Sequence, residues 1–211
     1  MKSEIKNFLK KYKTIRYKKG QILVRPGDNL GKIVLEKTGY ARIYKVTTDG
    51  KEISWPIIRP MWTYSLISSI LENENEYYAE AITNLEAWVV PMSDFINFLQ
   101  AKKEIELETY KSVIIDLFKL SEKMEKLIFA EALQKMAILI DDLAQNFGEK
   151  QKNEIVINFN VPHRVLASIT GLTRETVTLQ ILKMQKNKIL YNKGRSIVVK
   201  DVKKLKLLGQ M

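Results

Sequence analysis

The chain has 211 residues, with 35 lysines and arginines against 24 aspartates and glutamates, a formal net charge of +11 at pH 7. Its 45% hydrophobic and 28% charged content is that of a globular protein and argues against disorder. The absence of cysteine excludes disulfides, thiolate-held iron–sulfur clusters and cysteine-based zinc sites. No apolar run approaches the roughly 18 residues of a membrane span. The N-terminal MKSEIKNFLKKYK lacks the apolar core of a signal peptide, so we expect a cytoplasmic protein without a membrane partner.

The excess positive charge is concentrated near the C-terminal end. Residues 160–211 contain 11 basic and 2 acidic side chains, a net charge of 11 − 2 = +9, whereas residues 101–128 contain six of each. A basic block on a near-neutral body predicts a polyanionic partner. A solvated basic surface is the alternative, and charge alone does not separate the two.

Residues 14–90 predict a domain of short strands. Turn signals occur at Pro26-Gly27-Asp28, at Gly39 and at Thr48-Asp49-Gly50-Lys51, and the last predicts a hairpin because Asp-Gly tolerates positive φ. Many short strands with regular turns are typical of a sandwich or a small barrel. Two later strands are expected over 77–82 and 87–90, with a short helix over 65–71 before them.

Residues 104–128 contain no glycine or proline and predict one long helix. Its apolar residues recur at steps of three and four, which is a heptad seam. A second stripe at Ile114, Ser121 and Ile128 lies beside the seam. A helix that is apolar on two sides needs two covering surfaces, so we predict a dimer helix, with a single buried helix in a monomer as the alternative. The predicted dimer interface is Tyr110, Val113, Leu117, Leu120, Met124 and Leu127.

The region after this helix is expected to remain helical over 129–147, with Gly148 as the stop. A polar loop is expected over 149–154, and a short strand over 155–159.

Residues 161–177, VPHRVLASITGLTRETV, carry the pattern of a helix-turn-helix. Pro162 fits the first turn of a helix, Gly171 fits the tight turn, and Thr173 is a good N-cap for the second helix. Residues 189–191 and 196–199 then flank Asn192-Lys193-Gly194-Arg195, which predicts a hairpin with a basic tip, or wing. The second helix of such a unit enters the major groove of DNA, so we predict DNA binding. The alternative is a pair of helices and a hairpin with only a structural role, which does not explain the excess of basic residues over 160–211.

The sequence at 173–177, Thr-Arg-Glu-Thr-Val, followed by Leu182-Lys183-Met184 and Ile189-Leu190, resembles the recognition helix of the Crp/Fnr transcription regulators. The resemblance extends along nearly the whole chain. The strand region is similar to that family's cyclic-nucleotide-binding β-roll, through Gly20, Gly27, Gly39, the Asp49-Gly50-Lys51-Glu52 hairpin and Pro60.

The resemblance implies an α+β fold with three segments. These are an N-terminal double-stranded β-helix, a cupin-like β-roll, over 1–100, a dimerisation helix over 101–128, and a C-terminal winged helix-turn-helix over 129–211. It implies a homodimeric, non-enzymatic transcription regulator that binds an inverted-repeat operator in double-stranded DNA. RNA polymerase is the expected protein partner.

The outward positions of the second helix are predicted to read bases: Thr173, Arg174, Glu175, Thr178 and Leu179. Arginine can bond guanine O6 and N7 together, and glutamate can accept from cytosine N4. The resemblance implies these roles for Arg174 and Glu175. Leu179 stands where the family commonly has a second arginine, so we expect an unusual half-site, with Leu179 as a candidate contact to a thymine methyl.

Phosphate contacts position a protein on DNA without specifying sequence. The predicted contacts are His163, Arg164, Lys183, Lys193 and Arg195. His163, the only histidine, is either a phosphate contact or simply solvated, and without a second histidine or a nearby carboxylate pair we predict no metal site.

In nucleotide-binding members of the family, a Gly-Glu pair and an Arg-Ser pair hold the ribose and the cyclic phosphate. Here the first segment reads Met-Trp-Thr-Tyr-Ser-Leu over 61–66, and Tyr77-Tyr78 stands at the Arg-Ser position. An anionic phosphate leaving water needs a charge-assisted donor, best supplied by arginine. We therefore predict no cofactor and no control by cAMP or cGMP through these residues. The candidate effector pocket is formed by Trp62, Tyr64, Tyr77, Tyr78, Leu120 and Ser121. Its aromatic side chains either fill the pocket themselves or shape it for a flatter ligand.

Three other functions remain open at this point. A small-molecule-binding regulatory module without a DNA role does not need the motif and charge of residues 160–211. A cupin-like enzyme needs metal ligands in the β-roll, and residues 1–100 contain no histidine or cysteine. Among DNA-binding proteins, an effector-independent constitutive regulator is the runner-up.

Overall fold

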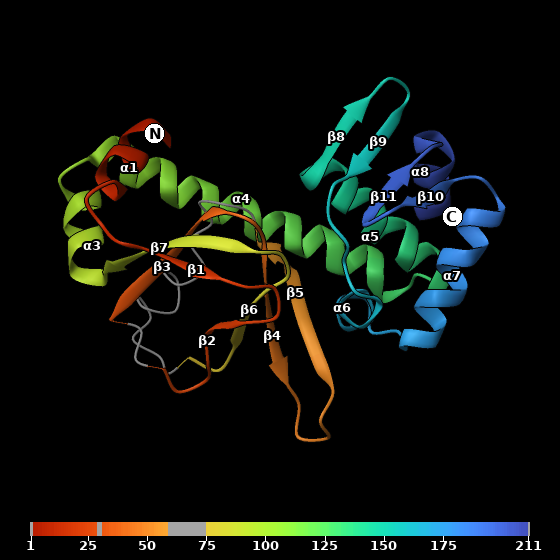
Figure 1. Cartoon of the computed structure of the whole chain (residues 1–211), viewed down its shortest axis with the longest axis horizontal. Helices are drawn as coiled ribbons and strands as arrows, with labels where there is room; N and C mark the ends of the chain where they lie inside the picture. Colours follow the sequence, from red (N-terminus) through yellow and green to blue (C-terminus); the bar gives the residue numbers. More distant parts are fainter. Residues whose placement is uncertain (1, 29–30, 59–74, 211) are drawn as a thin grey trace. The chain divides into compact units, whose positions relative to one another are not determined.

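A computed structural model describes residues 2–28, 31–58 and 75–210 of the chain (Figure 1). The chain divides into two compact units, Met1–Leu117 and Phe118–Met211. The long helix crosses this division, so each unit contains part of it.

The N-terminal unit is a β-roll of two antiparallel sheets (Figure 1). One sheet has the order β1 (Thr14–Tyr17), β7 (Leu85–Pro91), β3 (Lys32–Thr38). The other has the order β2 (Ile22–Val24), β6 (Tyr78–Ala81), β4 (Ala41–Val46), β5 (Glu52–Ile58). The hairpin predicted at 48–51 is confirmed between β4 and β5. The helix expected over 65–71 lies outside the described residues.

Alternating side chains divide the interior of this unit into two cores. On one face of the first sheet, Ile33 and Leu35 pack with residues of three helices, α1 (Lys2–Leu9), α3 (Met92–Gln100) and α4 (Lys103–Ile128). Between the two sheets, the buried residues are Ala41, Ile43, Ile58, Ala81, Leu85 and Ala87. The short helices that cover this face, α1 and α3, were not predicted from the sequence.

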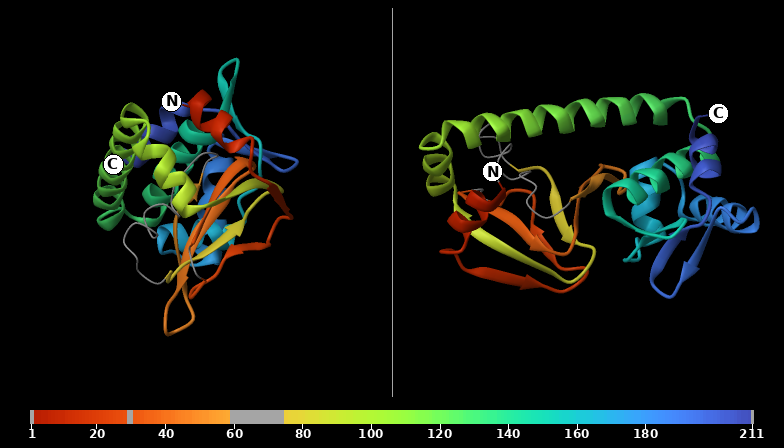
Figure 2. Two further views of the ribbon diagram at one scale, coloured as in Figure 1. Left: turned by 90° about the vertical axis from the view of Figure 1, so that its left-hand side faces the viewer. Right: turned by 90° about the horizontal axis from the view of Figure 1, so that it is seen from above.

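The long helix predicted over 104–128 is confirmed as α4, which runs without interruption in Figure 2. The helix expected over 129–147 is confirmed from residue 132 onward, with Gly148 as its C-cap, but it does not continue directly from α4. α4 ends at Ile128, and α5 (Ala132–Phe147) begins after a three-residue break. The break has a local cause, because the Glu131 backbone N–H donates to Gln134 Oε1 at 2.7 Å, as in a capping box.

The C-terminal unit combines α5 with a second helical layer and a small antiparallel sheet. After α5 come β8 (Gly148–Gln151), β9 (Glu154–Ile157), α6 (His163–Thr170), α7 (Arg174–Lys186), β10 (Leu190–Lys193), β11 (Ser196–Val199) and α8 (Val202–Gln210). The sheet order is β10-β11-β9-β8. The polar loop expected over 149–154 is wrong, since β8 and β9 form a hairpin there. The side chains of β8 are largely exposed, so this strand lacks the apolar alternation of a half-buried strand.

No helix within the described ranges is both long enough and apolar enough to cross a membrane.

Candidate nucleic-acid interface

The helix-turn-helix is built from α6 and α7, and its local signals act as the sequence predicts. Gly171 adopts φ +70° at the C-terminal end of α6, a left-handed conformation that side chains with a Cβ disfavour. The Thr173 side chain accepts the Thr176 backbone N–H at 3.1 Å and so caps the start of α7. These two residues fix the turn between the helices.

The inner faces of both helices are held by apolar burial. Val165 and Leu166 of α6 and Val177 and Met184 of α7 are each at most 1% exposed. Both helices contact α5. Burial of one stripe directs the opposite stripe of α7 to solvent.

That solvent-facing stripe carries most of the predicted base readers. Thr173, Arg174 and Glu175 are exposed at the first turn, and Leu179 is 58% exposed one turn further on. Leu182, which is not among the predicted base readers, is 54% exposed on the same helix. The spacing of three from Leu179 was the signal that could have identified it.

Thr178 and His163 lie differently from the other selected residues, since both are partly buried. His163 Nδ1 lies 2.8 Å from Thr178 Oγ1, and Thr178 Oγ1 donates to the Arg174 carbonyl at 2.9 Å. Burial of the ring and, secondarily, the charge of Arg174 lower the pKa of His163. The lowered pKa favours the neutral imidazole at pH 7.

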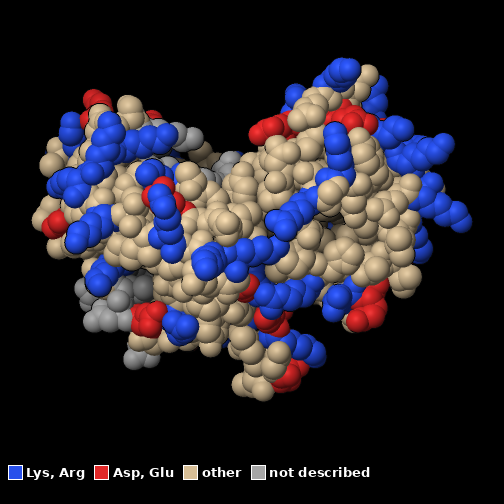
Figure 3. Space-filling view, viewed as in Figure 1, with Lys and Arg blue, Asp and Glu red and all other residues tan. Residues whose placement is uncertain are grey.

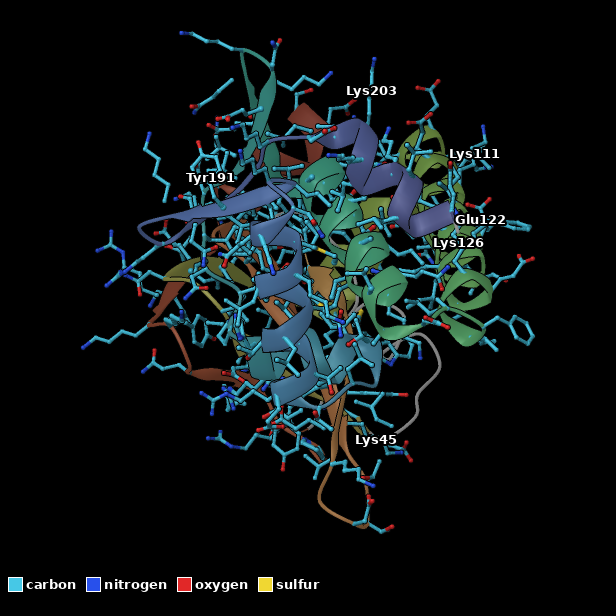
Figure 4. All side chains as sticks on the ribbon, turned by 90° about the vertical axis from the view of Figure 1, so that its right-hand side faces the viewer. Lys45, Lys111, Glu122, Lys126, Tyr191 and Lys203 are labelled. Atoms are coloured by element: carbon cyan, nitrogen blue, oxygen red, sulfur yellow. The ribbon has the colours of Figure 1, made fainter. Side chains whose placement is uncertain are left out.

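The predicted wing is confirmed as the β10–β11 hairpin, in which Lys193 pairs with Ser196. Lys193 and Arg195 are exposed around its tip, and Arg164 and Lys183 are exposed on the two helices. Figure 4 shows α7 facing the viewer, with Tyr191 on the hairpin at its side. The structure thus brings the helix residues and the wing residues to one unit.

The charge of this unit favours a polyanion. Figure 3 shows lysine and arginine side chains projecting from the outer edge of the C-terminal unit. Within residues 2–28, 31–58 and 75–210, no ion pair joins Arg174, Lys183, Lys193 or Arg195 to a carboxylate. Their charges are therefore available to phosphate groups.

The candidate effector pocket is only partly described. Trp62 and Tyr64 lie outside the described residues, and Leu120 and Ser121 belong to the C-terminal unit. In the β-roll, Tyr77 meets Trp55 edge-on at 5.4 Å between ring centroids, and Tyr78 stacks on Tyr44 at 5.0 Å. These ring contacts favour the interpretation in which Tyr77 and Tyr78 pack within the β-roll over the one in which they bind a flat ligand.

A buried ion cluster on the second sheet was not predicted. The Arg42 side chain is fully buried and donates to Glu80 Oε2 at 2.6 and 2.9 Å, to Glu52 Oε2 at 2.6 Å and to Ser54 Oγ at 3.2 Å. Its guanidinium also lies 4.0 Å from the centroid of the Tyr44 ring. Cross-strand pairing places Arg42 directly opposite Glu80, and no local sequence pattern reveals this pairing.

A second buried charge-bearing group, Glu36, lies opposite Ala87 on the strand pair β3–β7 and is 4% exposed. Among the residues that the structure describes, its Oε2 has no hydrogen-bond partner. Burial raises the pKa of the Glu36 carboxyl to about 8, so the group is neutral at pH 7. No group of three or more histidine or acidic side chains within the described chain is arranged to hold a metal ion.

Two family models match this architecture segment by segment. The cyclic nucleotide-binding domain matches residues 14–102, and the Crp-like helix-turn-helix domain matches residues 133–208. The chain belongs to the Crp/Fnr family. This family consists of transcription regulators, and this member carries its DNA-binding helix-turn-helix domain.

Individual relatives of this Crp/Fnr protein are distant but nearly collinear with it. It is 20% identical to the global nitrogen regulator of Synechococcus elongatus, over 87% of this chain and 84% of the relative. It is 22% identical to the CRP-like cAMP-activated global transcriptional regulator of Mycobacterium tuberculosis, over 85% of this chain and 79% of the relative. The structure of FixK2 from Bradyrhizobium japonicum matches with a TM-score of 0.79 and 19% identity, covering 93% of this chain and 96% of that one. The fold is therefore shared across most of the chain.

Proposed function

We propose that this Crp/Fnr protein is a homodimeric regulator that binds a specific inverted-repeat DNA operator and is not controlled by cAMP. Residues 1–100 serve as the effector domain, 101–128 as the dimerisation helix and 129–211 as the DNA-binding domain. The single observation that carries the DNA-reading part is the solvent-facing stripe of α7. It exposes Arg174, Glu175 and Leu179 on a helix whose opposite face is buried.

Each predicted reader offers a definite chemistry to the major groove. Arg174 supplies the two donors that match guanine, Glu175 supplies an acceptor for cytosine N4, and Leu179 supplies an apolar contact for a thymine methyl. Lys193 and Arg195 of the wing, with Arg164 and Lys183, contact phosphates. We propose RNA polymerase as the further protein partner.

The homodimer rests on the exposed apolar side chains of α4. Tyr110, Leu117 and Met124 of the seam are 45%, 64% and 55% exposed, and the neighbouring Phe118 is 66% exposed. A contiguous apolar stripe of this kind marks an interaction site. A second copy of the same helix satisfies it by coiled-coil packing. Two recognition helices about 34–36 Å apart then require an inverted repeat.

Independence from cAMP is supported by where the β-roll places its aromatic and cationic groups. Tyr77 and Tyr78 pack on neighbouring aromatics at the position where the resemblance expects an Arg-Ser pair. Arg42, the buried guanidinium, already bonds two carboxylates. Titration calorimetry with cAMP should give no heat of binding, and micromolar affinity would overturn this part of the proposal.

Sequence-specific binding is tested by selecting duplexes from a random pool and measuring affinity for the selected site and for single-base variants of it. Arg174→Ala should lose preference at one base pair per half-site, about 1–3 kcal/mol. Lys193→Ala is the matched control. It should weaken all duplexes about equally and reduce the slope of log affinity against log salt by about one. Equal loss on every duplex for Arg174→Ala would contradict the base-reading assignment.

Dimerisation is tested by sedimentation equilibrium of the full chain. Leu117→Arg places a charge in the centre of the seam and should shift the protein toward monomer. Lys111→Ala, on the same helix but outside the seam, is the control and should leave the dimer intact. A wild-type protein that sediments as a monomer at micromolar concentration would contradict the homodimer.

A further inference from the structure

His163 and Thr178 form a contact between the two helices of the helix-turn-helix. His163 is the first residue of α6, and Thr178 lies in the second turn of α7. Nδ1 of the imidazole and the threonine hydroxyl are 2.8 Å apart. From the same hydroxyl, a second hydrogen bond runs to the carbonyl of Arg174 at 2.9 Å. The chain of contacts therefore leads from α6 to the backbone of the predicted guanine reader.

The directions of these hydrogen bonds follow from the number of protons. A threonine hydroxyl has one hydrogen to donate, and here the Arg174 carbonyl receives it. Thr178 must then accept from His163, so Nδ1 of the neutral imidazole carries the hydrogen. With both directions assigned, the single hydrogen of the Thr178 hydroxyl is used inside the protein and is not available to donate to a base edge.

At one end of this chain of contacts, α6 is held in place by its buried inner face. At the other end, the Arg174 side chain is long and exposed. Val165 and Leu166 bury the inner face of α6, with exposures of 1% and 0%. Threonine hydroxyls that bond the carbonyl four residues earlier tend to bend a helix locally. Because the Arg174 side chain is long and exposed, a small rotation of the first turn of α7 would displace its guanidinium further than its backbone.

We propose that His163 and Thr178 are positioning residues, which orient the first turn of α7 and so determine how sharply Arg174 discriminates its base. This proposal rests on the proposed DNA-reading function. It replaces direct base contact by Thr178 and phosphate contact by His163. The lowered pKa of His163 agrees with this role, since a neutral ring is a poor phosphate ligand.

The test uses paired variants of the full chain and the panel of single-base duplexes described above. Thr178→Val keeps the shape and removes the hydroxyl, whereas Thr178→Ser keeps the hydroxyl. His163→Phe keeps a ring and removes the donor, whereas His163→Asn places an amide N–H near the position of Nδ1. The base pair read by Arg174 is identified independently with Arg174→Ala.

Thr178→Val and His163→Phe should each lose about tenfold in discrimination at the base pair of Arg174, with affinity for a non-specific duplex changed less than about twofold. Thr178→Ser and His163→Asn should restore discrimination. Unchanged discrimination in both disruptive variants overturns the proposal, and so does an equal loss on all duplexes. Far-UV circular dichroism identifies any variant that fails to fold. If a variant at one of the two positions does not fold, the pair of variants at the other position tests the proposal. If the wild type itself does not discriminate between duplexes, the proposed function fails rather than this inference.

Discussion

The two units of the chain place their distinctive polar groups in opposite environments. In the C-terminal unit, Arg174, Glu175 and Lys193 are exposed, on elements whose ends are fixed by nearby residues. In the β-roll, Arg42 and Glu36 are buried. Arg42 has three hydrogen-bond partners, whereas Oε2 of Glu36 has none within the described part of the chain. The C-terminal unit thus exposes the charged groups that we propose to bind DNA, whereas the β-roll uses Arg42 inside its own sheet.

The largest expected effect comes from breaking the buried cluster of the β-roll. Arg42→Met leaves Glu52 and Glu80 without their shared cation, and removing one partner of a buried ion pair costs roughly 3–5 kcal/mol. Trp55, Trp62 and Trp88 all belong to the N-terminal unit, so tryptophan fluorescence in a denaturant titration reports this unit alone.

The matched control is Lys45→Met, which removes a cation from the same strand. Lys45 pairs with Glu76, but their side chains are 47% and 63% exposed, so solvent screens the interaction and the midpoint should barely move. Equal midpoints for the Arg42 and Lys45 variants would show that the buried cluster adds no stability.

The second effect is a pH dependence confined to the β-roll. The pKa of Glu36 is about 8 in the folded protein because of burial, and about 4.5 is its ordinary value. Between these values the folded state holds a proton that the unfolded state has lost. Stability therefore falls as pH rises from about 5 to 8, by about 1.4 kcal/mol for each pH unit.

Glu36→Gln removes the titrating group and should flatten this profile in the same fluorescence titration, performed at pH 6 and pH 8. The variant should be the more stable protein at pH 8. A wild-type midpoint that does not change between the two pH values would contradict a buried, neutral Glu36.

The smallest effect probes the local order of the DNA-binding unit. Thr173→Ala removes the N-cap of α7 and should cost about 1 kcal/mol. Thr173→Ser retains the capping oxygen and is the control. Thermal unfolding followed by far-UV circular dichroism measures the change, with tryptophan fluorescence as the reference for the other unit. A loss of stability that appears equally in the tryptophan signal would contradict the locality of this cap.

The sequence by itself determined the elements whose signals lie within a few residues. The steps of three and four along 104–128 specified α4, and Gly171 and Thr173 specified the turn before α7. The capping box of Glu131 and Gln134 is a local signal too, and because it was overlooked the predicted helix began at residue 129 instead of Ala132. Local signals suffice here because caps and periodicity depend on the chain within one or two turns.

Tertiary structure decided which polar groups meet. Arg42 reaches Glu80 only because β4 and β6 pair in one register, and His163 reaches Thr178 only because α6 crosses α7 at the turn. Glu36 is buried because β3 turns its side chain between the sheets, opposite Ala87. Strand register and helix crossing depend on packing between distant segments, so no spacing within the sequence encodes these contacts.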